Sequence, residues 1–375
     1  MRRIPLMLFL VLGACTGTDP DDSGVDAGVE DTDESGLGTW KVPTCESIVG
    51  TGAVTFSTDG GATLVPTAEP LTTTAYTTGL VAFPDVPGRL LAVSHDALLR
   101  SDDAGCTWAD VDTLPILSRL VRGAAGTAWA WAPNTGAIAR VDADGTVTTL
   151  PSPTSAVLGF GAAADGTVAL GGGDGAVWTS TDGGLTWSVR GTVPVPSGSA
   201  MGYTMAFDPA DLDHAVFGLA SEGAFTTFDG GATWAPATGL GATGANVFTA
   251  TISPVDPDVV WAQGIDYAQN GDPVSQGRRI WRSEDGGHSF TTAVEQSETT
   301  ILLNGPLLVA DAADADVVWF VYGTWYGNYG TDLFRYDHTD GLTRTHNPYD
   351  TVGALTFSPA DPKVLYLGLS EERTE

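Results

Sequence analysis

The chain has 375 residues, of which 46 are Asp or Glu and 16 are Lys or Arg, so its formal charge is −30. This acidity argues against nucleic acid as a partner, because phosphate binding needs a basic surface that releases counterions. With 48 Gly, 22 Pro and 42% apolar residues, the composition excludes a fully disordered chain and provides for a sizeable core. After the first 15 residues there is no uncharged apolar run long enough for a membrane-spanning helix.

The amino terminus has the layout of an export signal. Two arginines precede an apolar run over residues 4–12, and Gly13 and Ala14 then lead to Cys15. Residues 12–15, Leu-Gly-Ala-Cys, resemble the lipobox of bacterial lipoproteins, which implies that Cys15 receives a diacylglyceryl group. We therefore expect residues 1–14 to be a lipoprotein signal peptide. The alternative is an ordinary cleaved signal followed by an incidental cysteine.

The position after the anchor bears on location. Thr16 stands where an Asp would be the usual mark for retention in the inner membrane, so the resemblance favours the outer membrane of a bacterial cell envelope, on its periplasmic or its surface face. Residues 16–36 carry eight acidic residues, no basic residue and no aromatic residue, a composition that cannot bury enough surface to fold. We expect residues 15–36 to be the lipidated cysteine and a disordered acidic tether. A calcium loop is the competing interpretation, but the closing Glu that such a loop needs is missing.

A short motif recurs in the rest of the chain at intervals of roughly 40 to 55 residues, which is the blade period of β-propellers. Five copies are clear and two, at residues 141–146 and 336–341, are degraded. The clear copies are residues 57–64 (STDGGATL), 101–108 (SDDAGCTW), 180–187 (STDGGLTW), 227–234 (TFDGGATW) and 283–290 (SEDGGHSF).

These residues resemble the Asp-box, or BNR repeat, of the β-propellers of sialidases, sortilin and photosystem-assembly factors. The motif suits a tight turn, because the Asp carboxylate accepts backbone N–H groups and Gly supplies a positive φ. The Trp that follows packs as an apolar wedge. We therefore expect the box residues Asp103, Asp182, Asp229 and Asp285 to stabilise turns and not to be catalytic.

A second recurring element, a Pro-Asp turn between two short apolar strands, is found at residues 207–211, 253–257 and 358–362. A blade then reads as four antiparallel strands, with the Pro-Asp turn after the first and the Asp-box after the third. Residues 354–370 match only the first two strands of a blade, and residues 52–64 match only the last two. We predict a single all-β propeller of seven blades over residues 37–375, closed by the C-terminal strands pairing with the N-terminal hairpin. Six or eight blades are also compatible.

Two neighbouring blades carry long connections, at residues 264–279 and 322–332, that should lie side by side on the face opposite the boxes. Aromatic, amide and guanidinium groups on them suit a sugar ring or a peptide. The candidate ligand-binding residues are Tyr267, Asn270, Arg278, Arg279, Trp325, Tyr326 and Tyr329. The competing interpretation is that these aromatic residues pack the long connections onto the propeller.

Evidence for catalysis is weaker. The resemblance to sialidases implies an Arg triad, which could be sought among Arg119, Arg122, Arg278, Arg279 and Arg282, but no Tyr and Glu pair can be assigned. The five His residues show no metal spacing and no phosphate loop occurs, so we expect neither a metal nor a cofactor.

The leading hypothesis is a lipid-anchored, monomeric, non-enzymatic propeller that binds a protein or a glycan through its long-connection face and meets the membrane only through Cys15. The alternative is a glycoside hydrolase, in which two of Asp266, Asp272 and Asp332 would act as acid and base. Export would also permit Cys45 and Cys106 to form a disulfide, a pairing that the sequence leaves open.

Overall fold

Antiparallel strands dominate the regular structure. The computed structural model describes residues 39–71, 75–133, 135–194, 201–241, 244–302, 307–321, 332–346 and 351–371. Within them lie 27 β-strands and one short 3-10 helix, η1 (Tyr267–Gln269). The described part of the chain includes no helix with the length and apolar character needed to cross a bilayer. The predicted residues of the tether and of the second long connection, 322–331, lie outside the described residues.

Five sheets contain four consecutive antiparallel strands each. In chain order they are β6–β9 (Arg119–Arg122, Thr127–Trp131, Ile138–Asp142, Val147–Leu150), β10–β13 (Val157–Ala162, Val168–Gly172, Ala176–Ser180, Ser188–Thr192), β14–β17 (Gly202–Phe207, Ala215–Leu219, Gly223–Thr227, Ala235–Pro236), β18–β21 (Ala245–Ile252, Val260–Asp266, Arg278–Ser283, Thr291–Glu295) and β22–β25 (Leu308–Ala310, Val317–Val321, Asp332–Asp337, Gly341–His346). The Pro-Asp segments at residues 207–211 and 253–257 connect the first strand of a sheet to the second, as predicted.

The remaining strands form one larger, seven-stranded sheet. It joins the meander β2–β5 (Ala75–Ala82, Leu90–Ser94, Ala97–Ser101, Ala109–Thr113) to β26 (Thr351–Phe357), β27 (Leu365–Glu371) and β1 (Val54–Ser57). The two groups are linked by two residue pairs, Ala75 with Glu371 and Tyr76 with Ser370. The prediction of seven separate four-stranded blades is therefore corrected. Five such blades are present, because β27 is long enough to pair with β2 and merges the strands expected for two further blades.

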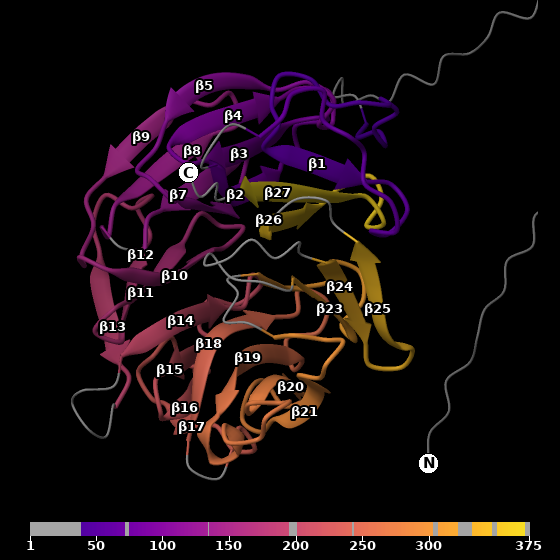
Figure 1. Cartoon of the computed structure of the whole chain (residues 1–375). Coiled ribbons are helices and arrows are strands. Elements are labelled where there is room, and N and C mark those ends of the chain that lie inside the picture. Colours follow the sequence, from indigo (N-terminus) through magenta and orange to yellow (C-terminus); the bar gives the residue numbers. More distant parts are fainter. Residues whose placement is uncertain are drawn as a thin grey trace, which may run out of the picture. The chain divides into compact units, whose positions relative to one another are not determined.

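The first strands of successive sheets follow one another around a ring, which Figure 1 shows from one end. β2 contacts β6, and the contacts continue through β10, β14, β18 and β22, while β26 contacts β2. Val317 and Trp319 of β23 share a hydrophobic cluster with Leu365 and Leu367 of β27, which completes the circuit. These contacts confirm the predicted all-β propeller of antiparallel four-stranded blades.

The core consists of apolar layers between neighbouring sheets. Trp129, Ile138 and Leu150 of the β6–β9 sheet pack against Phe160 and Leu170 of the next sheet. The rings of Trp129 and Phe160 are stacked, with centroids 5.5 Å apart. Because both faces of a sheet are covered in this way, inner strands such as β11, β15 and β23 are buried along their whole length and do not alternate between buried and exposed residues.

The Asp-boxes form the hydrogen-bonded turns that the motif predicts. Asp103 accepts bonds from the Thr107 N–H and the Thr107 hydroxyl, both at 2.8 Å, while the Gly105 N–H donates to Ser101 Oγ at 2.9 Å. The same carboxylate bonds recur at Asp59, Asp182, Asp229 and Asp285. The box carboxylates are therefore occupied in turns, as expected.

The boxes and the turns between first and second strands share one face, which we call the box face. The N–H of Gly230 in a box donates to the Asp213 carbonyl in the turn of the same sheet at 2.9 Å, and Gly286 donates to Asp258 at 2.8 Å. Equivalent bonds join Gly60 to Lys363, Ala104 to Gly88, and the degraded box at Ala143 to Gly126. The connections between second and third strands lie at the opposite face, the loop face.

The two ends of the described chain meet within the seven-stranded sheet. β1 pairs with β27 from Val54–Gly368 to Ser57–Leu365, so the C-terminal strands close the ring onto the N-terminal one as predicted. In Figure 1 the indigo strand β1 lies next to the yellow strand β27.

Residues 45–50 form an N-terminal strap between the closing strand β1 and the Asp-box of residues 101–108. Ile48 bonds with the Pro66 carbonyl and the Ala68 N–H on one side, and Val49 bonds with Cys106 and Trp108 on the other. Gly50 has a φ of +91°, and a side chain at this position would collide with the Trp108 carbonyl. The strap therefore ends at a residue that must be Gly, because any side chain at position 50 would strain the backbone.

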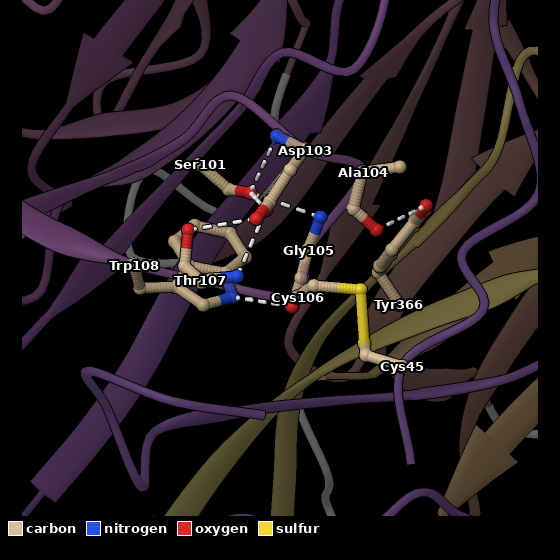
Figure 2. The surroundings of a disulfide bond; sticks show 9 residues. All are labelled: Cys45, Ser101, Asp103, Ala104, Gly105, Cys106, Thr107, Trp108 and Tyr366. Atoms are coloured by element: carbon tan, nitrogen blue, oxygen red, sulfur yellow. Dashed lines mark hydrogen bonds between the residues drawn. A yellow bond between two sulfur atoms is a disulfide. The ribbon is translucent and has the colours of Figure 1, made fainter. Parts of the chain in front are cut away.

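A disulfide fastens this strap. Cys45 and Cys106 are joined, with their Cα atoms 5.8 Å apart. Figure 2 shows the bond beside the box of Asp103, where Tyr366 of β27 also donates its hydroxyl to the Ala104 carbonyl at 3.0 Å. Three segments distant in sequence therefore converge on one box turn.

The box hydrogen bonds make stability depend on pH in the acid range. Bonds from the Thr186 hydroxyl and N–H lower the pKa of Asp182 from 3.8 to about 2, and bonds from Thr233 do the same for Asp229. Because the folded pKa is depressed, this stabilisation is complete above about pH 4 and is lost as the pH falls through about 2.

We predict that Asp182→Asn is less stable than wild type in urea unfolding at pH 7, and that the difference shrinks between pH 4 and pH 2. A difference that does not change with pH would contradict this role of the charge.

The disulfide should contribute strongly to stability because it closes a loop with a sequence separation of 61. Replacing both cysteines, Cys45→Ala with Cys106→Ala, is expected to lower the free energy of unfolding by about 4 kcal/mol. The measurement is urea unfolding of both proteins with and without reductant. Wild type under reductant should approach the variant, and reductant should not affect the variant itself. Equal urea midpoints for the two oxidised proteins would show that the strap does not need its disulfide.

Candidate functional site

The first predicted long connection lies on the loop face and is shorter than expected. β19 runs to Asp266 and β20 begins at Arg278, and Gly264 pairs with Arg279 across them. The connecting residues are therefore 267–277, which begin with η1. β19 and β20 stay paired beyond the predicted ends of the connection, because the segment folds back on itself. The Asp266 N–H donates to the Gly277 carbonyl at 2.7 Å.

The acidic residues of this connection are occupied by its own fold. Asp266 is 2% exposed, accepts a bond from the Ala268 N–H at 3.0 Å and lies 3.2 Å from Arg279 Nη1. Asp272 accepts the N–H groups of Val274 and Ser275, which lowers its pKa. Neither carboxylate is arranged as a free general acid or base, so their chemistry here is that of turn residues.

The candidate ligand-binding residues of the connection fall into two groups. The guanidinium of Arg279 pairs with Asp266 and with Glu295, at 2.8 Å, and donates a hydrogen bond to Gln269. Its role is therefore to stabilise the connection. Tyr267 and Asn270 are exposed, and Arg278 is half-buried, with its pKa lowered by burial. Tyr267 and Asn270 therefore present surface at the loop face.

Tyr267 is fixed in place although the residue is 42% exposed. Asn246 Nδ2 donates to the Tyr267 hydroxyl at 2.8 Å, and Asn246 Oδ1 accepts from the Ser221 N–H at 2.6 Å. The ring is thus tied to the neighbouring sheet. Nearby, Tyr203 packs edge-on against Phe248 with centroids 4.9 Å apart, and the pKa of Tyr203 is raised by burial and by Tyr267. Sequence reasoning missed Tyr203 and Phe248, because each lies within an ordinary strand and no motif marks them.

Trp325, Tyr326 and Tyr329 lie outside the described residues, so their predicted position beside Tyr267 stays a prediction. Asp332, at the start of β24, is 3.2 Å from Arg344 Nε. Like Asp266, it is already paired with a base.

A second feature of the loop face is a groove of about 560 Å³ next to residues 50–53. Its wall includes Glu69, Asp96 and Asp110, with His95 as the basic member. His95 Nδ1 lies 3.0 Å from Asp96 Oδ1, and this contact lowers the pKa of Asp96. No sequence pattern marks this groove, because its lining comes from separate segments, at residues 50–53, 69–71, 94–99 and 110. The acidic residues of this wall favour the binding of a basic group.

The buried histidine His214 has structural contacts. His214 Nε2 is 2.9 Å from the Gly286 carbonyl, and its ring stacks on Phe228 at 4.4 Å, while Phe228 also stacks on His288. Among the described residues, no group of three or more His, Cys, Asp and Glu side chains is placed to hold a metal ion.

Comparison with known proteins gives one strong relationship. The chain is 47% identical over 340 residues to the dispase autolysis-inducing protein of Streptomyces mobaraensis, covering 88% of this chain and 90% of that protein. It is also 27% identical over 226 residues to a xyloglucanase of Paenibacillus sp, covering 54% of this chain and 20% of that enzyme. No protein-family model matches the sequence.

Solved structures support the fold. The GH74 enzyme of Niastella koreensis superposes with a TM-score of 0.58 at 16% identity, covering 84% of this chain and 53% of the enzyme, so this chain spans about half its length. YCF48 bound to a D1 peptide superposes with a TM-score of 0.55 at 14% identity, covering 87% of this chain and all of YCF48. At these identities the likeness extends to the β-propeller fold alone.

Proposed function

Because the chain belongs to the family of the dispase autolysis-inducing protein, we propose that it is a non-enzymatic propeller that docks onto a secreted protease and induces that protease to digest itself. The observation that carries this proposal is the high identity to that relative along nearly the whole length of both proteins. Autolysis is self-digestion, so the bond cleavage belongs to the target, and this chain has only to bind and to change what it binds.

The geometry of the loop face agrees with docking better than with catalysis. A glycosidase needs two carboxylates at a defined separation that are open to the substrate. Asp266 is buried against Arg279, and Asp272 is occupied by two backbone N–H groups. A docking surface, in contrast, needs rigid exposed anchors, and Tyr267 is held rigidly by Asn246. YCF48, a propeller of similar fold, has been solved with a bound peptide.

We place the contact on the loop face, with Tyr267 as an aromatic anchor and the acidic groove of Glu69, Asp96 and Asp110 facing a basic segment of the target. Complementary charge would speed the encounter and make binding sensitive to salt. A glycan on the same face, or a residual glycoside hydrolase activity, is the alternative.

The amino terminus completes the proposal. Export to the cell envelope and lipidation at Cys15 would tether the propeller outside the cytoplasm, and the Cys45–Cys106 disulfide suits an oxidising compartment.

We predict that the chain expressed in a bacterial host is found in the membrane fraction, and that its mature amino terminus is a diacylglyceryl-modified Cys15 by mass spectrometry. Replacing Cys15 with Ser should release the protein from that fraction. An unmodified amino terminus on the wild-type protein would contradict the anchor.

The function is tested by incubating dispase with the purified mature chain and following intact dispase by gel electrophoresis. We expect dispase to disappear faster as the concentration of the chain rises, while a catalytically inactive dispase stays intact under the same conditions. Cleavage of the inactive dispase would mean that the chain is itself a protease. An unchanged lifetime of active dispase, at a large excess of chain, would overturn the proposal.

Matched variants locate the contact. Tyr267→Ala removes an exposed anchor on the loop face, and Leu185→Ala removes a side chain that is 61% exposed in a box turn on the opposite face. The first should weaken the effect on dispase by about tenfold and the second should leave it unchanged. Equal effects would place the contact elsewhere. Assays for turnover of xyloglucan and of sialosides test the glycoside hydrolase alternative with the same samples.

A further inference from the structure

A cavity of about 420 Å³ lies where the first strands of the sheets meet. β6, β10, β14, β18, β22 and β26 all contribute to its wall, so it occupies the centre of the ring. Its volume is within the range of roughly 300–1,000 Å³ that small ligands occupy in proteins.

The wall combines apolar and hydroxyl-bearing residues. Trp131, Leu158, Phe160 and Met205 are among its apolar members. Thr204, Thr251 and Thr356 also line it, from β14, β18 and β26. An occupant of this cavity would therefore meet apolar surface together with groups that can both donate and accept hydrogen bonds.

One charged residue, Arg119 of β6, is part of this wall. Its guanidinium carbon lies 5.1 Å from the centroid of the Trp131 ring, which holds the side chain by a cation–π contact. Burial lowers the pKa of Arg119, and no carboxylate counters that effect.

The absence of an acidic partner distinguishes Arg119 from most arginines of the described chain. Eight other described arginines have a carboxylate within 4 Å, namely Arg89, Arg100, Arg140, Arg190, Arg279, Arg282, Arg335 and Arg344. The side chain of Arg119 has neither an ion pair nor a hydrogen bond within the described part of the chain, although the protein carries 46 acidic residues. A half-buried cation without a counterion favours an anionic ligand.

The guanidinium can be reached from the cavity. Among the described residues, no side-chain nitrogen of Arg119 is both sealed from solvent and without a hydrogen-bond partner. The nitrogens of Arg119 therefore face open space, and a carboxylate could approach them in the bidentate geometry that Arg prefers.

We propose that this cavity binds the carboxyl terminus of a peptide that ends in a large apolar residue. The terminal carboxylate pairs with Arg119, the last side chain packs against Trp131, Phe160 and Met205, and the threonine hydroxyls bond to the peptide amides. A fatty acid shares the carboxylate and the apolar body, but it has no amides for the hydroxyls to meet. The site is independent of the proposed contact on the loop face.

The test is calorimetric titration of the mature chain with N-acetyl-Ala-Ala-Phe and with the same peptide as a carboxyl-terminal amide. The acid is expected to bind roughly ten- to a hundredfold more tightly than the amide, which is the loss expected for a hydrogen-bonded charge. Equal affinity for the acid and the amide, or no binding of either, would overturn the proposal. Octanoate provides the third titration, and tighter binding of octanoate than of the peptide acid would overturn the assignment to a peptide.

Two variants on the same strand give the matched control. Arg119→Gln removes the charge that faces the cavity, and Arg122→Gln removes an exposed charge three residues further along β6. The first should abolish the preference for acid over amide, and the second should retain it. Because Arg119 has no ion pair to lose, Arg119→Gln should fold, which thermal unfolding checks, and Arg119→Lys should recover part of the preference. A full preference in Arg119→Gln would show that the carboxylate binds elsewhere.

Discussion

Closure of the ring is the constraint on which this structure depends. A sheet with free edges exposes unpaired N–H and C=O groups, and an incomplete ring of sheets would leave apolar layers open at both ends. The chain solves both problems at one place. β27 pairs with β26 on one side and with β1 on the other, so strands from the two ends of the described chain share one sheet. The N-terminal strap and its disulfide then fix this sheet to the next Asp-box.

The convergence on the box of residues 101–108 shows how a repeated turn acquires a particular role. All five clear boxes use their carboxylates in the same way, but this one also bonds to Tyr366 and carries Cys106. Ala104 replaces the Gly found in the other four clear boxes and keeps a φ of +58°. A left-handed conformation in a residue other than Gly is tolerated only where surrounding bonds hold it, and here Tyr366 and the Gly88 carbonyl bond to the same residue.

The distribution of charge separates structural from functional groups. Acidic residues greatly outnumber basic ones, and many of the described Asp side chains are used in turns or in pairs with Arg. Because bases are scarce, an Arg without an acidic partner is informative, whereas an acidic cluster by itself is not. The loop face and the central cavity therefore present different chemistry. The first offers an anchored aromatic ring and an acidic groove, and the second offers a single cation beside an apolar wall.

The sequence by itself determined the class of fold, the box turns and the closing pair of strands, because these depend on local hydrogen bonds and on a repeated pattern. Ser101, Asp103, Gly105 and Thr107 contain within a few residues every group that their turn needs. The tertiary structure decided what depends on distant neighbours. It merged β2 with β27 into a larger sheet, turned Asp266 and Arg279 into partners of each other, and left Arg119 without a counterion. No local pattern distinguishes Arg119 from Arg279, because the difference lies in which strands the ring places around each of them.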